Sequence, residues 1–155
     1  MKKLLTTREK ETLVQRHREE RDGRIRDRIK AILLYDKGYS YSEIAQILLL
    51  DDEGTHVRHG AGPSLPDAYN KGFDGEPIGP VAGSCGTAAY RKERVIVSDI
   101  ANDPLWVNYR DFALSFGLKA CWSTPILNND GKVYGTFAIY YRECRTPEEA
   151  DLKLI

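Results

Sequence analysis

The stretch Ile47-Leu48-Leu49-Leu50, followed by Asp51-Asp52-Glu53-Gly54, decides the fold of this 155-residue chain. Four consecutive aliphatic residues that run into an acidic turn are typical of a buried strand entering a hairpin. The residues just before them indicate something else, because Ser40 and Glu43 form a capping box that predicts a helix from about Tyr41. Local propensity therefore leaves this segment open between strand and helix.

Beyond Gly54 the sequence predicts short strands that alternate with helices. Asn129-Asp130-Gly131 is a strong hairpin signal between two long strands. Asp103 and Pro104 suit the N-cap and the first position of a helix, which Gly117 ends. The apolar residues of this helix recur at spacings of four, three and four, which predicts one buried stripe of Leu105, Tyr109, Phe112 and Phe116. The other predicted elements are strands over 55–59, 94–97, 119–127 and 132–141, helices over 67–69 and 84–90, and a final helix capped at Thr146.

Composition and cysteine content indicate a globular chain in a reducing compartment. The sequence is 41% apolar and 30% charged, and no run approaches the roughly 20 apolar residues that cross a bilayer. Three cysteines (Cys85, Cys121 and Cys144), without an export signal, predict reduced thiols and a cytoplasmic location. They form no close cluster and have no histidine near them, so we expect no metal site.

The amino-terminal part differs in charge from the rest. Residues 1–37 hold 12 Lys and Arg against 7 Asp and Glu, whereas residues 38–155 hold 11 against 16. Two helices are predicted over 7–37, and the apolar positions of the second fall on one helix face: Ile25, Ile29, Ile32 and Leu33. A net positive charge fits a nucleic-acid partner, but interleaved acidic and basic residues fit a solvated helix surface equally well.

Six motifs in order resemble those of GAF domains, the sensory modules of bacterial sensor histidine kinases and diguanylate cyclases. They are Ile47–Asp51, Gly83–Ala89, Val95–Ile100, Asp103–Trp106, Cys121–Ile126 and Gly135–Tyr140. The resemblance implies an α+β fold, an antiparallel sheet of about five to six strands covered by helices. In that family the first of these motifs is an interior strand, and losing it would leave its neighbours' backbone groups unpaired. We therefore predict a strand over 46–51.

The segment before this domain resembles a second family. Arg26–Leu34 and Gly38–Ala45 are similar to the helix-turn-helix start of insertion-sequence transposases related to the mariner group. Such domains continue with a recognition helix, where this chain has Gly54 and β-favouring residues instead. We predict a fusion: an incomplete helix-turn-helix-like helical segment over 1–44, followed by a GAF domain over 45–155.

The resemblance to GAF domains implies a ligand site between the sheet and the elements that cover it. Carried over to this sequence, the candidate ligand-binding residues are Cys85, Thr87, Trp106, Tyr109, Trp122 and Phe137. Aromatic walls with a few polar tips suit small organic molecules, although Tyr109 and Phe137 also fit plain core positions and Cys85 fits an inert buried thiol. No cofactor is predicted. Bilin-binding members attach the chromophore to a Cys that a His follows, and no Cys of this sequence precedes a His. The signature of cyclic-nucleotide-binding members is incomplete after Phe73.

The sequence thus predicts a sensory or regulatory module that binds a small molecule, or forms a homodimer, and signals through its terminal helix. No catalytic residues are assigned, so we expect no enzyme. Neither nucleic acid nor membrane is an expected partner. Two alternatives are a DNA-binding transposase fragment fused to a GAF domain and a free methionine sulfoxide reductase. The reductases use a cysteine upstream of Cys85, which is missing here, and their third cysteine lies farther from its strand than Cys121 does.

Overall fold

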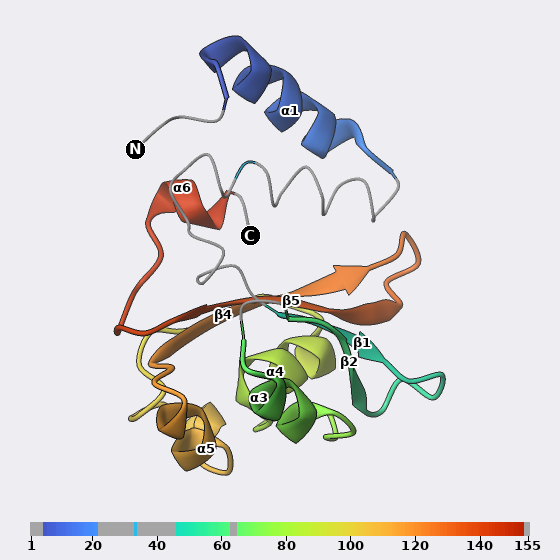
Figure 1. The fold of residues 1–155 in the computed structure, drawn as a ribbon. Coiled ribbons are helices and arrows are strands. Elements are labelled where there is room, and N and C mark those ends of the chain that lie inside the picture. Colours follow the sequence, from blue (N-terminus) through green and yellow to red (C-terminus); the bar gives the residue numbers. More distant parts are fainter. Residues whose placement is uncertain (1–4, 22–32, 34–45, 63–64, 154–155) are drawn as a thin grey trace.

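A five-stranded antiparallel sheet forms the centre of the computed structural model, which describes residues 5–21, 33, 46–62 and 65–153 (Figure 1). The strands lie in the order β2-β1-β5-β4-β3. Their bounds are β1 (Gln46–Leu50), β2 (Val57–Ala61), β3 (Val95–Val97), β4 (Ala120–Leu127) and β5 (Val133–Tyr141). Because β1 pairs with β2 on one side and with β5 on the other, the aliphatic stretch is an interior strand. The predicted strand and the predicted α+β fold are confirmed.

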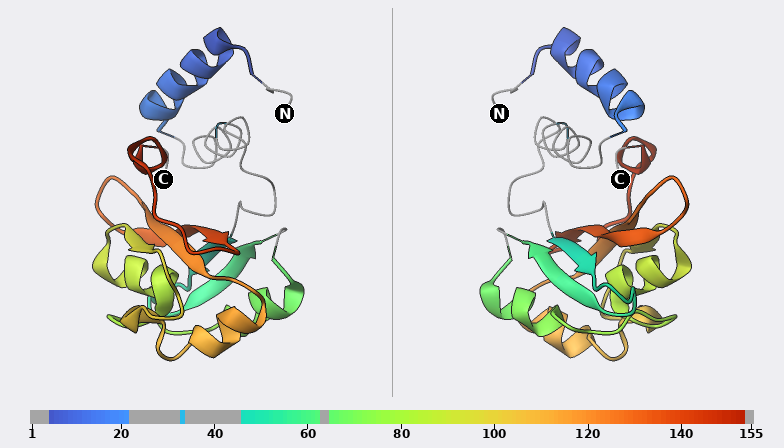
Figure 2. Two further views of the ribbon diagram at one scale, coloured as in Figure 1. Left: turned by 90° about the vertical axis from the view of Figure 1, so that its left-hand side faces the viewer. Right: turned by 90° about the vertical axis from the view of Figure 1, so that its right-hand side faces the viewer.

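Short helices cover one face of this sheet, which we call the inner face (Figures 1 and 2). They are α3 (Asp67–Phe73), α4 (Gly83–Arg91), the 3-10 helix η1 (Pro104–Trp106) and α5 (Arg110–Ser115). Two further helices, α1 (Thr7–Glu19) and α6 (Glu149–Leu152), lie on the opposite, outer side (Figure 1). Buried apolar residues lie on both faces of the sheet.

Side chains alternate between these two faces along β4 and β5, as the twofold period of a strand requires. Cys121, Ala138 and Tyr140 belong to the inner cluster, which also contains residues of α3, α4 and η1. The neighbouring residues Ala120, Trp122, Phe137, Ile139 and Tyr141 form a separate outer cluster. This parity decides which side chains can reach a site beneath the helices.

The predicted helix after Asp103 is broken in two, yet three residues of the predicted stripe, Leu105, Tyr109 and Phe116, are partly buried and pack against the inner cluster. Asp103 does cap it, since its Oδ1 accepts a hydrogen bond of 2.9 Å from the Leu105 N–H. However, η1 ends at Trp106 and α5 begins only at Arg110. A 3-10 turn has three residues rather than 3.6, and a non-helical link follows it, so the predicted stripe does not lie along one continuous helix. Trp106 is buried as well, and Phe112, which is 36% exposed, stacks on the Tyr69 ring.

Two predicted boundaries shift for local reasons. The return strand begins at Val57 rather than at residue 55, because the Asp51 carboxylate accepts hydrogen bonds from the backbone N–H groups of Thr55 and His56 and holds both in the turn. The final helix is capped by Glu148 and not by Thr146, whose hydroxyl donates to Ser98 Oγ at 3.0 Å.

Helix α1 confirms the first predicted helix of the amino-terminal part, and Thr6 and Glu9 form its capping box. The second helix and the capping box at Ser40 lie outside the described residues, apart from Leu33, which is helical and buried. The proposed boundary at residue 45 stays a prediction. Within the described ranges, no helix has the length and apolar character needed to span a bilayer.

Candidate functional site

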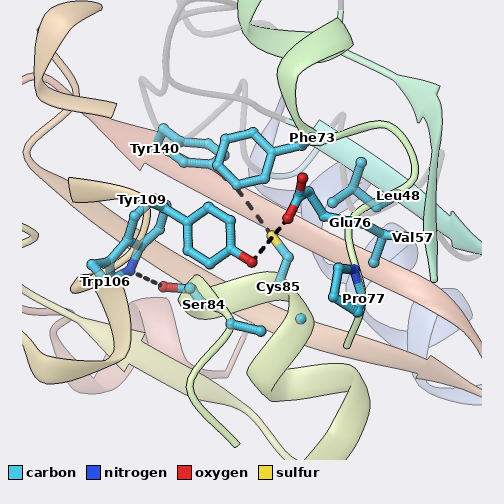
Figure 3. A pocket seen from close by; sticks show the side chains of 13 residues that line it. Leu48, Val57, Phe73, Glu76, Pro77, Ser84, Cys85, Trp106, Tyr109 and Tyr140 are labelled. Carbon is cyan, nitrogen blue, oxygen red and sulfur yellow. Dashed lines mark hydrogen bonds between the residues drawn. The ribbon is translucent and has the colours of Figure 1, made fainter. Parts of the chain in front are cut away.

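A small cavity lies beneath the inner face, beside the first turn of α4 (Figure 3). Residues of β1, β2, α3, α4, η1 and β5 contribute to its walls, among them Leu48, Phe73, Cys85, Trp106, Tyr109 and Tyr140. The space open to the centres of water molecules is about 10 Å³, which is room for about one water. Glu76, Pro77, Ala82 and Tyr109 are the lining residues that keep exposed surface, so the mouth of the cavity lies among them.

Hydrogen bonds fix the buried indole of Trp106. Its Nε1–H donates to Ser84 Oγ at 3.1 Å, and the Ser84 hydroxyl donates to the Cys121 carbonyl at 3.1 Å. One serine therefore connects η1, the start of α4 and strand β4. This arrangement holds the indole as a rigid wall of the cavity.

A single hydrogen bond spans the mouth. The Tyr109 hydroxyl donates to Glu76 Oε2 at 3.0 Å (Figure 3), which ties the loop after α3 to the link between η1 and α5. Partial burial raises the pKa of Tyr109, and the hydrogen bond and negative charge of Glu76 raise it further. Tyr109 is therefore the donor, and Glu76 contributes the one charged side chain among the described lining residues.

A chain of buried polar groups runs from the back of the cavity toward α3. Cys85 Sγ lies 3.8 Å from Tyr140 Oη. The Tyr140 hydroxyl donates to Gln46 Oε1 at 3.2 Å, Gln46 donates to Asn70 at 3.1 Å, and Asn70 donates to the Gly62 carbonyl at 2.9 Å. Buried polar groups need such partners. Asn70 therefore holds α3 against β1.

The structure brings together three of the six predicted site residues, Cys85, Trp106 and Tyr109. Thr87 is fully buried, and its Oγ1 accepts a hydrogen bond of 3.1 Å from Ala82 N, so it holds the start of α4 rather than lining the cavity. Trp122 and Phe137 lie in the outer cluster. These two placements correct the prediction, and the reason is strand parity: each residue is one position away from an inward-facing neighbour.

The outer face has its own polar contact to Trp122. The indole Nε1–H donates to the Arg145 carbonyl at 3.0 Å, and the Arg145 guanidinium lies over the Tyr141 ring, 4.8 Å from its centre. Cation–π contacts of this kind are attractive. Trp122 thus anchors the segment that leads from β5 to α6.

Sequence reasoning missed Glu76, Ser84 and Tyr140 as site residues. Ser84 and Tyr140 lie within motifs that pointed to the family, whereas Glu76 lies in a Gly- and Pro-rich connection that carries no periodic signal. No group of three or more potential metal ligands occurs in the described part of the chain. His56 instead lies 3.2 Å from the Asp51 carboxylate.

Comparisons with known proteins agree with this architecture. The family described as GAF domain matches residues 36–155. A methyl sulfide methyltransferase-associated sensor of Methanosarcina acetivorans is 42% identical over 112 residues, which are 72% of this chain. Because the match spans 11% of that sensor, it concerns only a small part of the relative.

Solved structures add a likeness of fold. The domain of a putative two-component sensor histidine kinase from Sinorhizobium meliloti superimposes with a TM-score of 0.57 at 21% identity, covering 72% of this chain and 69% of that one. The free methionine-R-sulfoxide reductase of Neisseria meningitidis, solved in complex with its substrate, gives a TM-score of 0.61 at 20% identity, covering 95% and 80%. At these identities the likeness concerns the fold alone.

Proposed function

Because this chain belongs to the family of GAF domains, we propose that it is a non-catalytic sensory module whose inner cavity binds a small molecule. The sensor relative supports a role in signalling, and the antiparallel fold supports the place of the site. The observation that carries the proposal is the mouth, where one hydrogen bond between Tyr109 and Glu76 closes a cavity lined by a fixed indole.

Ligand binding is coupled to a movement of this mouth. The closed cavity holds about one water, so an organic ligand enters only when the Tyr109–Glu76 hydrogen bond opens. The loop that bears Glu76 also pairs with the hairpin, since the Val57 N–H donates to the Glu76 carbonyl at 2.8 Å. Displacing the loop therefore acts on β2, and a bound molecule changes the edge of the sheet.

The lining favours neutral or cationic ligands over anions. Trp106, Tyr109 and Phe73 offer aromatic faces, and Glu76 offers a negative charge at the mouth. Aromatic faces attract cations, and a carboxylate repels other carboxylates. Among amines, neutral aromatic compounds and organic acids of equal size, we expect the acids to bind least.

The test is a thermal-shift screen of the full chain against these three classes, followed by calorimetry on each hit. A ligand at a hundredfold excess over its Kd stabilises the fold by about 2.7 kcal/mol. Trp106→Ala should abolish the response. Trp122→Phe is the matched control, because it alters the other indole on the outer face. An equal response from both variants would refute this cavity as the site.

Direct assays test the two alternative functions and the route by which the module signals. For a non-catalytic module we expect no turnover of free methionine sulfoxide with thioredoxin as reductant. We also expect no gel shift of duplex DNA at low salt, where electrostatic binding is strongest. If the module signals through its terminal helix, a ligand found in the screen should change the hydrogen-exchange protection of α6. If it signals through dimerisation, the ligand should change the sedimentation coefficient of the chain.

A further inference from the structure

The size of the inner cavity limits what it holds without a movement of its walls. The space open to the centres of water molecules is about 10 Å³, which is room for about one water. An ammonium ion has a single heavy atom, as water has, so it occupies this space and needs no wider route than water does. An ammonium group therefore fits the closed cavity, whereas bulkier groups fit only after the mouth opens.

The side chains of the lining offer acceptors rather than donors of hydrogen bonds. Four side-chain donors are committed to protein acceptors: Trp106 to Ser84, Ser84 to the Cys121 carbonyl, Tyr109 to Glu76 and Tyr140 to Gln46. The Cys85 thiol is the remaining side-chain donor of the described lining, and its sulfur lies 3.8 Å from Tyr140 Oη. An ammonium group has donors and no acceptor, so it is complementary to this lining.

Glu76 supplies a negative charge that is held in place. Its Oε2 accepts the Tyr109 hydrogen bond, and the two oxygens of a carboxylate offer about four lone-pair sites. Among the described residues, no basic side chain forms an ion pair with it. The Val57 N–H donates to the Glu76 carbonyl at 2.8 Å, and the Gly75 N–H donates to the Val57 carbonyl at 2.8 Å. The carboxylate is thus preorganised at the mouth for a cation.

Aromatic rings form much of the remaining wall (Figure 3). The centre of the Phe73 ring lies 5.5 Å from that of Tyr109 and 6.3 Å from that of Trp106, and the Trp106 and Tyr140 rings are 6.3 Å apart. A ring attracts a cation within about 6 Å of its centre, so a cation beside one of these rings is in reach of a second. N–H groups also form weak hydrogen bonds to ring faces. The rings therefore assist Glu76 in replacing the water that an ammonium group loses.

We propose that the inner cavity is a recognition site for an ammonium group, either the free ammonium ion or the head of a small primary amine. This inference rests on the proposed function of the cavity and names its ligand class. Glu76 is the counter-ion and accepts an N–H of the ligand, and the aromatic rings surround the charge. The alkyl group of an amine points out through the mouth.

The same features discriminate against other ions. Potassium has the same charge but no N–H group, and it binds where several oxygens replace its water, whereas Glu76 is the one carboxylate of the described lining. Tetramethylammonium is attracted by aromatic rings but has no N–H group and exceeds the cavity. Acetate is the opposing probe, because the first turn of α4 also lines the cavity and the start of a helix favours anions. We expect Glu76 to repel it.

The experiment is a calorimetric titration of the full chain in potassium chloride buffer. The probes are the chlorides of ammonium, methylammonium and tetramethylammonium, and potassium acetate. We expect saturable binding of ammonium or methylammonium and none of the other two, and the tighter of the first two identifies the free ion or the amine head as the ligand. Glu76→Gln keeps an acceptor for Tyr109 but removes the charge, so it should weaken binding about tenfold or more. Glu143→Gln is the matched control, because Glu143 is exposed in the segment after β5.

The outcomes that overturn the proposal include two that need no variant. If neither ammonium nor methylammonium binds saturably above the potassium background, or if acetate binds instead, the cavity is not an ammonium site. Equal weakening by Glu76→Gln and Glu143→Gln would place the binding elsewhere. A neutral aromatic compound whose binding requires Trp106 but not the Glu76 charge would keep the cavity as the sensing site and remove the ammonium group as its ligand. Failure of this inference is thus distinguishable from failure of the proposed function.

Discussion

Ser84 is the residue on which the cavity depends most. Its hydroxyl accepts the Trp106 N–H and donates to the Cys121 carbonyl, so Ser84→Ala leaves a buried indole N–H without a partner. Such a loss costs about 1–3 kcal/mol. Urea unfolding should show this decrease in the free energy of unfolding. Ser115→Ala is the control, because that exposed hydroxyl donates only to the Phe112 carbonyl of its own helix, and a surface change of this kind stays within about 0.5 kcal/mol. Equal effects would contradict the role of Ser84.

Three of the six predicted site residues line the cavity, and strand parity explains two of the three that do not. Cys85, Trp106 and Tyr109 line the cavity, but Trp122 and Phe137 do not. Both faces of β4 and β5 carry buried apolar residues, and helices lie on each side of the sheet (Figure 2). The usual alternation of polar and apolar residues, which identifies the inward face of a strand, is therefore missing from these two strands. Sequence alone gave no means of choosing between Cys121 and Trp122 as the inward residue.

At the scale of elements, the close approach of β1 to β5 makes a sharp prediction. A side-chain carbon added at Gly135 would clash with the Leu48 carbonyl oxygen, so the two strands cannot keep their spacing around an alanine. Gly135→Ala should lower the free energy of unfolding by about 3 kcal/mol. Gly79→Ala is the matched control, because its added carbon would lie 3.9 Å from Ala82 Cβ, an ordinary contact. Thermal denaturation that finds the two variants alike would contradict this packing.

Element types were predictable where the local signal was strong, and failed where distant contacts decide. The hairpin at Asn129–Gly131 and the cap at Asp103 are confirmed. The Ile47–Leu50 segment remained open locally, and its pairing with both β2 and β5 decides it. The break between η1 and α5 has no signal in the apolar spacing, since Leu105 and Tyr109 still pack against the core and Trp106 is buried beside them.

At the scale of the whole molecule, β4 connects the cavity to the outer face. Cys121 and Trp122 are adjacent, one facing α4 and the other holding the Arg145 carbonyl. Trp122→Phe removes that hydrogen bond, and we expect residues 145–152 to open more readily by about 1 kcal/mol. Hydrogen exchange of this segment is the measurement. Unchanged protection of residues 145–152 would contradict the anchoring role of Trp122.

The central claim, that the inner cavity is the sensing site, has an internal reference in the two indole N–H groups. Trp106 points into the cavity and donates to Ser84, whereas Trp122 donates to Arg145 on the opposite face. A nitrogen–proton NMR spectrum of the full chain, titrated with a hit from the ligand screen, reports on both groups at once, and Trp106→Phe assigns the signals. We predict that the Trp106 signal moves with saturation while the Trp122 signal moves far less. A shift confined to Trp122 would contradict the claim.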